Sequence, residues 1–226
     1  MIANGSATGN GGWLATCSAR LRWGCAVLSG GVTGLALPPF DLWFFGLVGL
    51  ALSFQLLRAS ASARQAAMVG WGFGSGFFAV TLHWIVEPFL VDADRYLWMA
   101  PFALVLLAGG LALLWGAAFA LARRLSSGGW HWALALGWGG AELLRGYLFT
   151  GFPWGMFAYV WLDTPVAQVA SLVGPYGLTL LSFLIAAAVI GGAAASRVAA
   201  LAFVALVLVY GVQRQDAEAP LVGDAP

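Results

Sequence analysis

The amino-acid sequence predicts an all-α polytopic membrane protein that folds as a bundle of about seven transmembrane helices. Three observations lead to this prediction. Charged residues make up only 8% of the 226 residues, whereas soluble domains carry roughly 25%. Hydrophobic residues make up 62%, and the mean hydropathy is +0.89. The few charged residues, 10 basic and 9 acidic, are also spaced so that long apolar runs lie between them.

Seven apolar runs are candidates for membrane crossings, each of which needs about 20 apolar residues. They cover residues 23–38, 42–57, 65–86, 97–122, 130–148, 168–194 and 198–213. The second and seventh runs have 16 residues each, so the arginines beside them would have to extend toward the membrane surface. Residues 20–213 are therefore predicted to form one transmembrane domain. Residues 1–19 are predicted to form a flexible tail, and residues 214–226 a second tail after the last span.

The distribution of charge supports the count of seven. Seven arginines and no acidic residue fall on one side of the predicted membrane: Arg20, Arg22, Arg58, Arg64, Arg123, Arg124 and Arg197. The other side holds Arg95, Arg145, Arg214 and all nine acidic residues: Asp41, Glu87, Asp92, Asp94, Glu142, Asp163, Asp216, Glu218 and Asp224. Because arginine-rich loops mark the cytoplasmic side, the N-terminus is predicted to be cytoplasmic and the C-terminus to lie across the membrane.

Spaced glycines predict that these helices pack against one another. Small residues four positions apart let helix backbones approach closely in lipid. Three glycine pairs have this spacing: Gly30/Gly34, Gly70/Gly74 and Gly72/Gly76. A packed bundle is therefore expected rather than a set of separate membrane anchors.

Several classes of function are excluded by composition. A net charge of +1 offers no electrostatic surface for nucleic acid. The two cysteines, Cys17 and Cys25, lack the spacing of a metal finger and are too few for a disulfide framework. The two histidines, His83 and His131, fall on opposite sides of the predicted membrane, so no metal site is expected. No cofactor is predicted either.

The segment from Glu142 to Pro165 differs from the rest of the chain. Glu142 and Arg145 are three residues apart at the outer end of the fifth run, so they share a helix face and can pair. Residues 151–154, Gly-Phe-Pro-Trp, should then break the helix, in a turn that needs protein or water around it. Two interpretations are open from the residues alone. The pair and turn anchor a helix end, or they form a lipid-headgroup or substrate site on the outer face.

Four motifs together point to a known family. The most specific is Glu142-x-x-Arg145-Gly146-x-x-x-Thr150-Gly151-Phe152-Pro153-Trp154. The others are Pro38-Pro39-Phe40-Asp41 after the first run, His83-Trp84-Ile85 at the end of the third, and Tyr159-x-x-x-Asp163-x-Pro165. These motifs resemble apolipoprotein N-acyltransferases, and the resemblance extends from about Arg20 to Gln213.

The resemblance implies a multi-pass protein of the bacterial cytoplasmic (inner) membrane, with its C-terminus in the periplasm. Such enzymes take an acyl chain from a membrane phospholipid and place it on the amino group of the diacylglyceryl-cysteine that begins a maturing lipoprotein. The implied partners are therefore a phospholipid donor and a diacylglyceryl apolipoprotein.

The same resemblance supplies candidate substrate-binding or structural residues on the outer face. They are His83, Trp84, Glu142, Arg145, Thr150, Gly151, Phe152, Pro153, Trp154 and Tyr159. Our hypothesis is that Arg145 holds the outer motif or an anionic headgroup, while Glu142 fixes the Arg145 side chain. We interpret His83 as an interfacial polar residue.

Catalytic residues are not expected in this chain. In the family, a cysteine thioester, a glutamate and a lysine act within a periplasmic carbon–nitrogen-hydrolase domain that follows the seventh span. This sequence contains no lysine and ends twelve residues after Arg214. Cys17 and Cys25 are predicted on the cytoplasmic side and lack an activating partner. We therefore expect the membrane part of such an enzyme, inactive alone, with a separate hydrolase domain as a further partner. The sequence is compatible both with a genuinely short protein and with a truncated gene.

Three alternatives belong to other classes. A small transporter would favour internal repeats and ionisable residues at mid-membrane, and neither is present in the sequence. An intramembrane serine protease would use Ser75, but His83 lies eight residues further along and His131 on the other side. A non-catalytic scaffold or remnant of an acyltransferase is the third.

Overall fold

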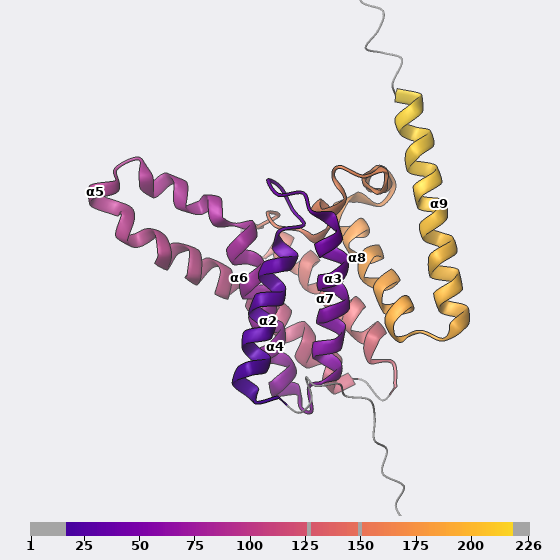
Figure 1. Ribbon diagram of the computed structural model, residues 1–226, viewed down its shortest axis with the longest axis horizontal. Coiled ribbons are helices and arrows are strands. Elements are labelled where there is room, and N and C mark those ends of the chain that lie inside the picture. The colour runs from indigo at the N-terminus through magenta and orange to yellow at the C-terminus, as the bar shows by residue number, and fades with distance from the viewer. Residues whose placement is uncertain (1–16, 126–127, 149–150, 219–226) are drawn as a thin grey trace, which may run out of the picture.

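Helices form all the regular structure in the described part of the chain. The computed structural model describes residues 17–125, 128–148 and 151–218 (Figure 1). No strand is present in these ranges, which confirms the all-α prediction. Thr150, one of the candidate site residues, lies outside them.

Long helices alternate with short helical turns in the described ranges. The long ones are α2 (Ala19–Gly34), α3 (Trp43–Arg58), α4 (Ala63–Thr81), α6 (Ala100–Leu125), α7 (Trp130–Tyr147), α8 (Ala170–Gly191) and α9 (Ala194–Glu218). The short ones are η1 (His83–Leu90), α5 (Ala93–Tyr96), η2 (Leu97–Met99), η3 (Phe157–Trp161) and η4 (Pro165–Val169). Helix α8 is kinked at Gly174, which has a φ of 69° and is followed by Pro175.

Three stretches of helix are long and apolar enough to cross a membrane by themselves. They cover Ala93–Leu125, Pro165–Gly191 and Ala194–Ala217. A fourth candidate joins α4 to η1 across a bend of 47°. Helix α3 is apolar but shorter. The structure thus contains three candidate membrane spans, or four if the bent pair counts as one, and seven crossings stays a prediction.

Helix α4 lies at the centre of the bundle, packed between α2 and α6. Its glycines face both neighbours. Gly76 lies against the backbone of α2 at Val27, and Gly74 lies against Ala112 of α6. On α2, Gly30 lies against the carbonyl group of Phe73. The spaced glycines therefore act as predicted, because a side chain at these positions would hold the helices apart.

Large aromatic rings fill the core beside α4. Trp115 of α6 and Trp138 of α7 meet edge to face, with ring centroids 4.8 Å apart. Trp138 also stacks on Phe183 of α8, at 4.4 Å. Phe73 of α4 closes the cluster against both tryptophans. These four residues are fully buried, so they link four helices into one rigid unit.

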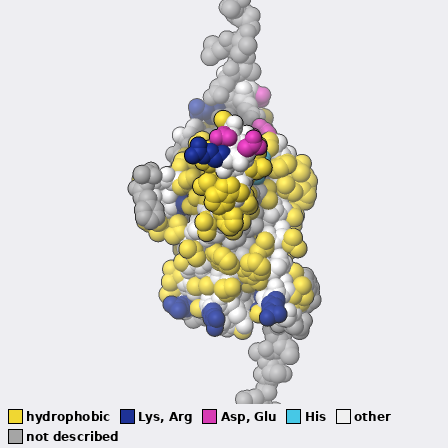
Figure 2. All heavy atoms as spheres, turned by 90° about the vertical axis from the view of Figure 1, so that its left-hand side faces the viewer, with side chains coloured by type: hydrophobic (Ala, Val, Ile, Leu, Met, Phe, Trp, Pro, Cys, Tyr) yellow, Lys and Arg dark blue, Asp and Glu magenta, His cyan; other side chains and the backbone are white. Residues whose placement is uncertain are grey.

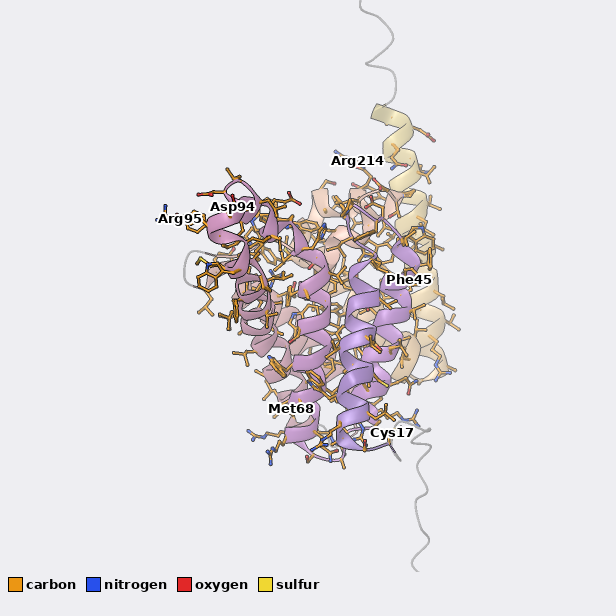
Figure 3. The ribbon with its side chains drawn as sticks, turned by 60° about the vertical axis from the view of Figure 1, so that its left-hand side comes forward. Cys17, Phe45, Met68, Asp94, Arg95 and Arg214 are labelled. Carbon is orange, nitrogen blue, oxygen red and sulfur yellow. The ribbon has the colours of Figure 1, made fainter. Side chains whose placement is uncertain are left out.

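An arm projects sideways from this bundle. Helix α4 bends into η1, α5 forms the tip, and α6 returns to the core (Figure 1). The tip carries Asp94 and Arg95, whereas Cys17 and Met68 lie at the opposite end of the molecule (Figure 3). On the face that the arm presents, the acidic side chains lie at one end, with an arginine beside them, and the charged side chains at the other end are arginines (Figure 2).

One arginine of the arginine-rich end is buried. Arg22 is 7% exposed and lies within α2 rather than in a loop. Its guanidinium donates hydrogen bonds to the carbonyl of Ala59, to Gln65 Oε1 and to the carbonyl of Cys17, at 3.3, 3.1 and 3.1 Å. The side chain thereby joins the start of α2 to the connection between α3 and α4.

The close contact between α2 and α4 yields a test at Gly30. A Cβ atom there would overlap the carbonyl group of Phe73, whereas one at Gly24, on the same helix, would meet nothing within 4 Å. Gly30→Ala should lower the free energy of unfolding by about 2–3 kcal/mol, measured by thermal unfolding in detergent. Gly24→Ala should be neutral or stabilise by up to ~1 kcal/mol, because alanine favours helix. Equal effects would contradict this packing.

Candidate functional site

A buried ion pair lies near the C-terminal end of α7. Glu142 and Arg145 are 1% and 2% exposed, and Arg145 Nη2 lies 2.7 Å from Glu142 Oε2. Arg145 Nε donates a second hydrogen bond to Glu142 Oε1, at 3.2 Å, so the pair is bidentate. The indole N–H of Trp115 donates to the same oxygen, at 2.7 Å. The ion pair expected from the three-residue spacing is therefore present, and Trp115 of α6 also binds its carboxylate.

The other face of the Arg145 guanidinium binds the loop that follows α7. Its Nη1 donates to the carbonyls of Phe152 and Trp154, at 2.7 and 2.6 Å. Its Nη2 lies 3.5 Å from the carbonyl of Gly155. An arginine has five N–H donors in a fixed geometry. The two hydrogen bonds to Glu142 and the three contacts with loop carbonyls together occupy all five. Arg145 Cζ lies 5.2 Å from the centroid of the Phe78 ring on α4, so the guanidinium also makes a cation–π contact.

The loop has a backbone shape that two glycines permit. Helix α7 ends at Tyr147, a few residues before the Gly-Phe-Pro-Trp sequence. Gly151 and Gly155 have φ values of 79° and 67°, in the left-handed region that side chains disfavour. The backbone N–H of Phe152 returns a hydrogen bond to the carbonyl of Arg145, at 3.1 Å. The turn thus folds back on α7 and presents three of its carbonyls to one cation.

Helix α8 holds the far end of the same loop. Thr179 Oγ1 accepts a hydrogen bond from the backbone N–H of Ala158, at 3.1 Å. Ser182 Oγ accepts one from the indole N–H of Trp161, at 2.8 Å. Both hydroxyl groups belong to buried residues on α8. Sequence reasoning missed them, although their three-residue spacing on an otherwise apolar helix was a usable signal.

Exposed aromatic side chains cover the outer surface of the loop. The rings of Trp84 and Trp154 meet edge to face at 5.8 Å, and the two residues are 40% and 54% exposed. Tyr159 donates a hydrogen bond to the carbonyl of Pro153, at 3.4 Å. Burial raises the pKa of Tyr159 above its ordinary value of 10.0, nearby Tyr176 adds to the rise, and Arg145 opposes it.

The structure brings together most, not all, of the candidate residues. Residues 151–154, Tyr159 and the Glu142–Arg145 pair form one cluster, and Trp84 reaches it through Trp154. His83 is exposed, bonds the carbonyl of Val80 at 2.8 Å and lies beside Phe40. These contacts lie apart from the ion pair, and the interfacial polar role of His83 stays a prediction.

Two partners of the pair carried no signal in the sequence. Trp115 and Phe78 lie within apolar runs that contain many aromatic residues. Their contacts with Glu142 and Arg145 depend on how α4 and α6 pack on α7. Only the folded arrangement distinguishes them from other core aromatics.

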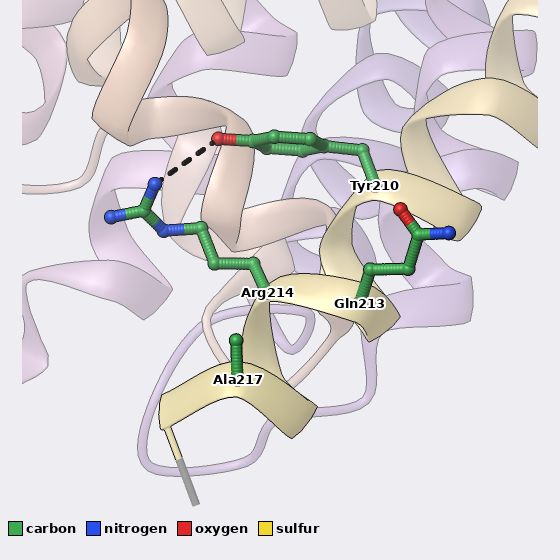
Figure 4. A pocket seen from close by; sticks show the side chains of 4 residues that line it. All are labelled: Tyr210, Gln213, Arg214 and Ala217. Atoms are coloured by element: carbon green, nitrogen blue, oxygen red, sulfur yellow. Dashed lines mark hydrogen bonds between the residues drawn. The ribbon is translucent and has the colours of Figure 1, made fainter.

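Other chemical groups lie away from this cluster. Cys17 and Cys25 are free thiols, and Cys17 lies at the end of the molecule opposite Asp94 and Arg95 (Figure 3). In the described ranges no three metal-ligating side chains are grouped. A hollow of about 440 Å³ lies near the C-terminal end of α9, lined by Tyr210, Gln213, Arg214 and Ala217 (Figure 4).

The buried pair yields a stability test. Glu142→Gln keeps the shape of the side chain but leaves the Arg145 charge buried without a carboxylate. The free energy of unfolding in detergent should fall by about 3–5 kcal/mol. Glu87→Gln is the matched control, because Glu87 is exposed and should change stability by less than about 1 kcal/mol. A small loss at Glu142 would show that the pair does not stabilise the fold.

Comparison with known proteins shows which family the chain resembles. Residues 29–188 match the apolipoprotein N-acyltransferase N-terminal domain. The apolipoprotein N-acyltransferase of Rhodopseudomonas palustris is 39% identical over 179 residues, 72% of this chain and 33% of that protein. Those of Rhizobium rhizogenes and Caulobacter vibrioides are 36% and 37% identical, over 83% and 89% of this chain and 38% and 39% of theirs. The chain thus spans between a third and two-fifths of the length of these relatives. By the extent of these matches, it belongs to the apolipoprotein N-acyltransferase family, and its residues correspond to the N-terminal domain.

Proposed function

We propose that this chain forms the membrane part of an enzyme that transfers an acyl chain from a phospholipid to the N-terminal diacylglyceryl-cysteine of a lipoprotein. Its relatives carry the name apolipoprotein N-acyltransferase. The most specific motif supplies Arg145 and the beginning of the loop that follows α7, residues 151–161, which we call the outer loop. The observation that carries the proposal is the Arg145 contact with the carbonyls of Phe152 and Trp154, because it gives this motif one fixed shape.

The proposed topology has seven membrane crossings in the bacterial inner membrane. The cytoplasmic side would hold the arginine-rich end, and the periplasmic side the acidic residues and the outer loop. On the visible face the acidic side chains lie at one end only, away from the arginines at the other end (Figure 2), which supports this orientation. The outer end of α9 lies at the same end of the molecule as the loop (Figure 1), so a chain that continues from α9 would continue on the side of the motif.

The proposed role of the cluster is positioning. Every N–H of the Arg145 guanidinium already faces Glu142 or a loop carbonyl, which favours holding the loop over binding a headgroup. The chain has no lysine, so the proposal assigns the cysteine, glutamate and lysine chemistry to a carbon–nitrogen-hydrolase domain. The outer loop would form the membrane-side boundary of the space where phospholipid and lipoprotein meet that domain.

A chimera tests this function. Residues 20–213 would replace the corresponding N-terminal region of the Caulobacter vibrioides enzyme, in cells depleted of their own N-acyltransferase. We expect the chimera to acylate lipoproteins, measured by mass spectrometry of their N-terminal lipopeptides. Arg145→Ala in the chimera should lower acylation by about a hundredfold, since a loop misplaced by about 1 Å can cost that much.

The control for this experiment is Arg124→Ala. Arg124 is an exposed arginine at the end of α6 away from the loop, and its removal should leave acylation unchanged. A chimera that inserts and accumulates normally but acylates no lipoprotein would refute the proposed function. Equal activity of the Arg145→Ala and Arg124→Ala chimeras would refute the positioning role.

A further inference from the structure

Gly146 belongs to the most specific motif of the sequence, and three segments of the chain meet at this glycine. Helix α7 contributes Gly146 itself. The outer loop returns to it, because a Cβ atom at Gly151 would overlap the carbonyl oxygen of Gly146. Helix α8 also reaches it, since a Cβ atom at Gly146 would overlap the hydroxyl group of Tyr176. The hydrogen bonds of Arg145 do not require a glycine at position 146, whereas the Tyr176 hydroxyl does.

Two glycines of α7 each lie against one side chain of α8. Gly139 lies against Leu180, and Gly146 lies against Tyr176. The glycines are seven residues apart, so they lie on one face of α7, about two turns from each other. Tyr176 and Leu180 are four residues apart and share a face of α8. The two helices therefore pack side by side in opposite directions, and Tyr176 makes the contact nearer to the outer loop.

The kink in α8 determines where Tyr176 lies. Gly174 has a φ of 69°, and Pro175 follows it, so the helix is interrupted directly before Tyr176. Tyr176 thus stands in the first turn of the longer part of α8. Its ring also lies beside the ring of Tyr147, with centroids 6.3 Å apart. Because a tyrosine side chain has only two rotatable χ angles and a rigid ring, a shift of α8 at this point is passed on to the end of α7.

Tyr176 is also close to a residue of the outer loop. Burial is the main cause of the raised pKa of Tyr159, and the phenol of Tyr176 adds to the rise, so the two side chains are near each other. Tyr159 in turn donates a hydrogen bond to the carbonyl of Pro153 in the same loop, at 3.4 Å. Tyr176 is therefore near the loop at two points, at Gly146, to which the loop returns, and at Tyr159.

From this arrangement we propose that Tyr176 is a further positioning residue for the acyl transfer. Its ring and hydroxyl group rest on Gly146 and hold the end of α7, and with it the outer loop, at a fixed distance from α8. The inference rests on the proposed function, because it takes the outer loop to border the space where the reaction occurs. Arg145 fixes the shape of the loop, whereas Tyr176 fixes its place over the bundle. Positions 146 and 176 must then match in size.

An exchange of size between the two positions tests this inference, with amide hydrogen exchange of the full chain in detergent as the measurement. Gly146→Ala places a methyl group where the Tyr176 hydroxyl lies, so exchange in residues 151–161 should accelerate about tenfold, a usual effect of overpacking. The methyl group would crowd Oη, Cζ and Cε1 of Tyr176, and a leucine lacks all three atoms. Gly146→Ala combined with Tyr176→Leu should therefore return exchange to within about threefold of the native chain.

Two further variants complete the series. Tyr176→Leu alone leaves a space above Gly146, so exchange in the loop should accelerate in this variant as well. Tyr176→Phe removes only the hydroxyl oxygen and keeps the ring, so Gly146→Ala combined with Tyr176→Phe should exchange at a rate between those of Gly146→Ala and the native chain. In the chimera, the single variants Gly146→Ala and Tyr176→Leu should each lower acylation about tenfold, and their combination should restore it.

Gly139→Ala is the matched control. A Cβ atom at Gly139 would meet the end of the Leu180 side chain, in the same pair of helices but seven residues from Gly146. This variant should lower the temperature of unfolding in detergent and leave both loop exchange and acylation unchanged. Equal acceleration of loop exchange by Gly139→Ala and Gly146→Ala would show a general loosening of α7 from α8, and would overturn the inference.

The two measurements separate this inference from the proposed function. An active chimera, together with a combined Gly146→Ala and Tyr176→Leu variant whose loop exchange does not recover, refutes this inference alone. Recovered exchange without recovered acylation also refutes it, because the reaction then does not depend on where Tyr176 holds the loop. Recovered exchange, with an unsubstituted chimera that acylates no lipoprotein, refutes the proposed function and leaves Tyr176 as the residue that places the loop.

Discussion

The buried contact between Glu142 and Arg145 determines how the outer surface is organised. A charge inside an apolar bundle is stable only when its partners surround it. Glu142 receives hydrogen bonds from Arg145 and from the indole of Trp115. Arg145 then has N–H groups left over, and the carbonyls of the outer loop accept them. The order of the loop is therefore a consequence of satisfying a buried charge.

The bundle supplies a rigid support for this arrangement. Trp115 touches Glu142 on one side and the buried rings of Phe77 and Trp138 on the other. Two helices hold the loop, α7 through Arg145 and α8 through Thr179. Movement of either helix would shift the loop. The proposed positioning role of the loop thus depends on the packing of the bundle beneath it.

The sequence predicted the parts of this arrangement that local spacing determines. The helical class follows from composition, and the Glu142–Arg145 pair follows from their three-residue separation on one helix. The role of Trp115 could not be predicted, because Trp115 and Glu142 lie 27 residues apart in the chain and meet only through the register between α6 and α7. The burial of Arg22 was hidden for the same reason, since its acceptors include a carbonyl in the connection after α3. The spaced glycines predicted close contacts between helices, but not which neighbouring helix each glycine meets.

Amide hydrogen exchange in the outer loop tests the central claim most directly. Arg145→Lys keeps the positive charge, but a lysine ammonium group lacks the planar set of five donors that binds Glu142 and the loop carbonyls at the same time. If the guanidinium orders the loop, exchange in residues 151–161 should accelerate at least about tenfold, equivalent to roughly 1.4 kcal/mol of local opening free energy. Exchange in residues 134–141, in the middle of α7, should stay the same. Unchanged exchange in the loop would contradict the account.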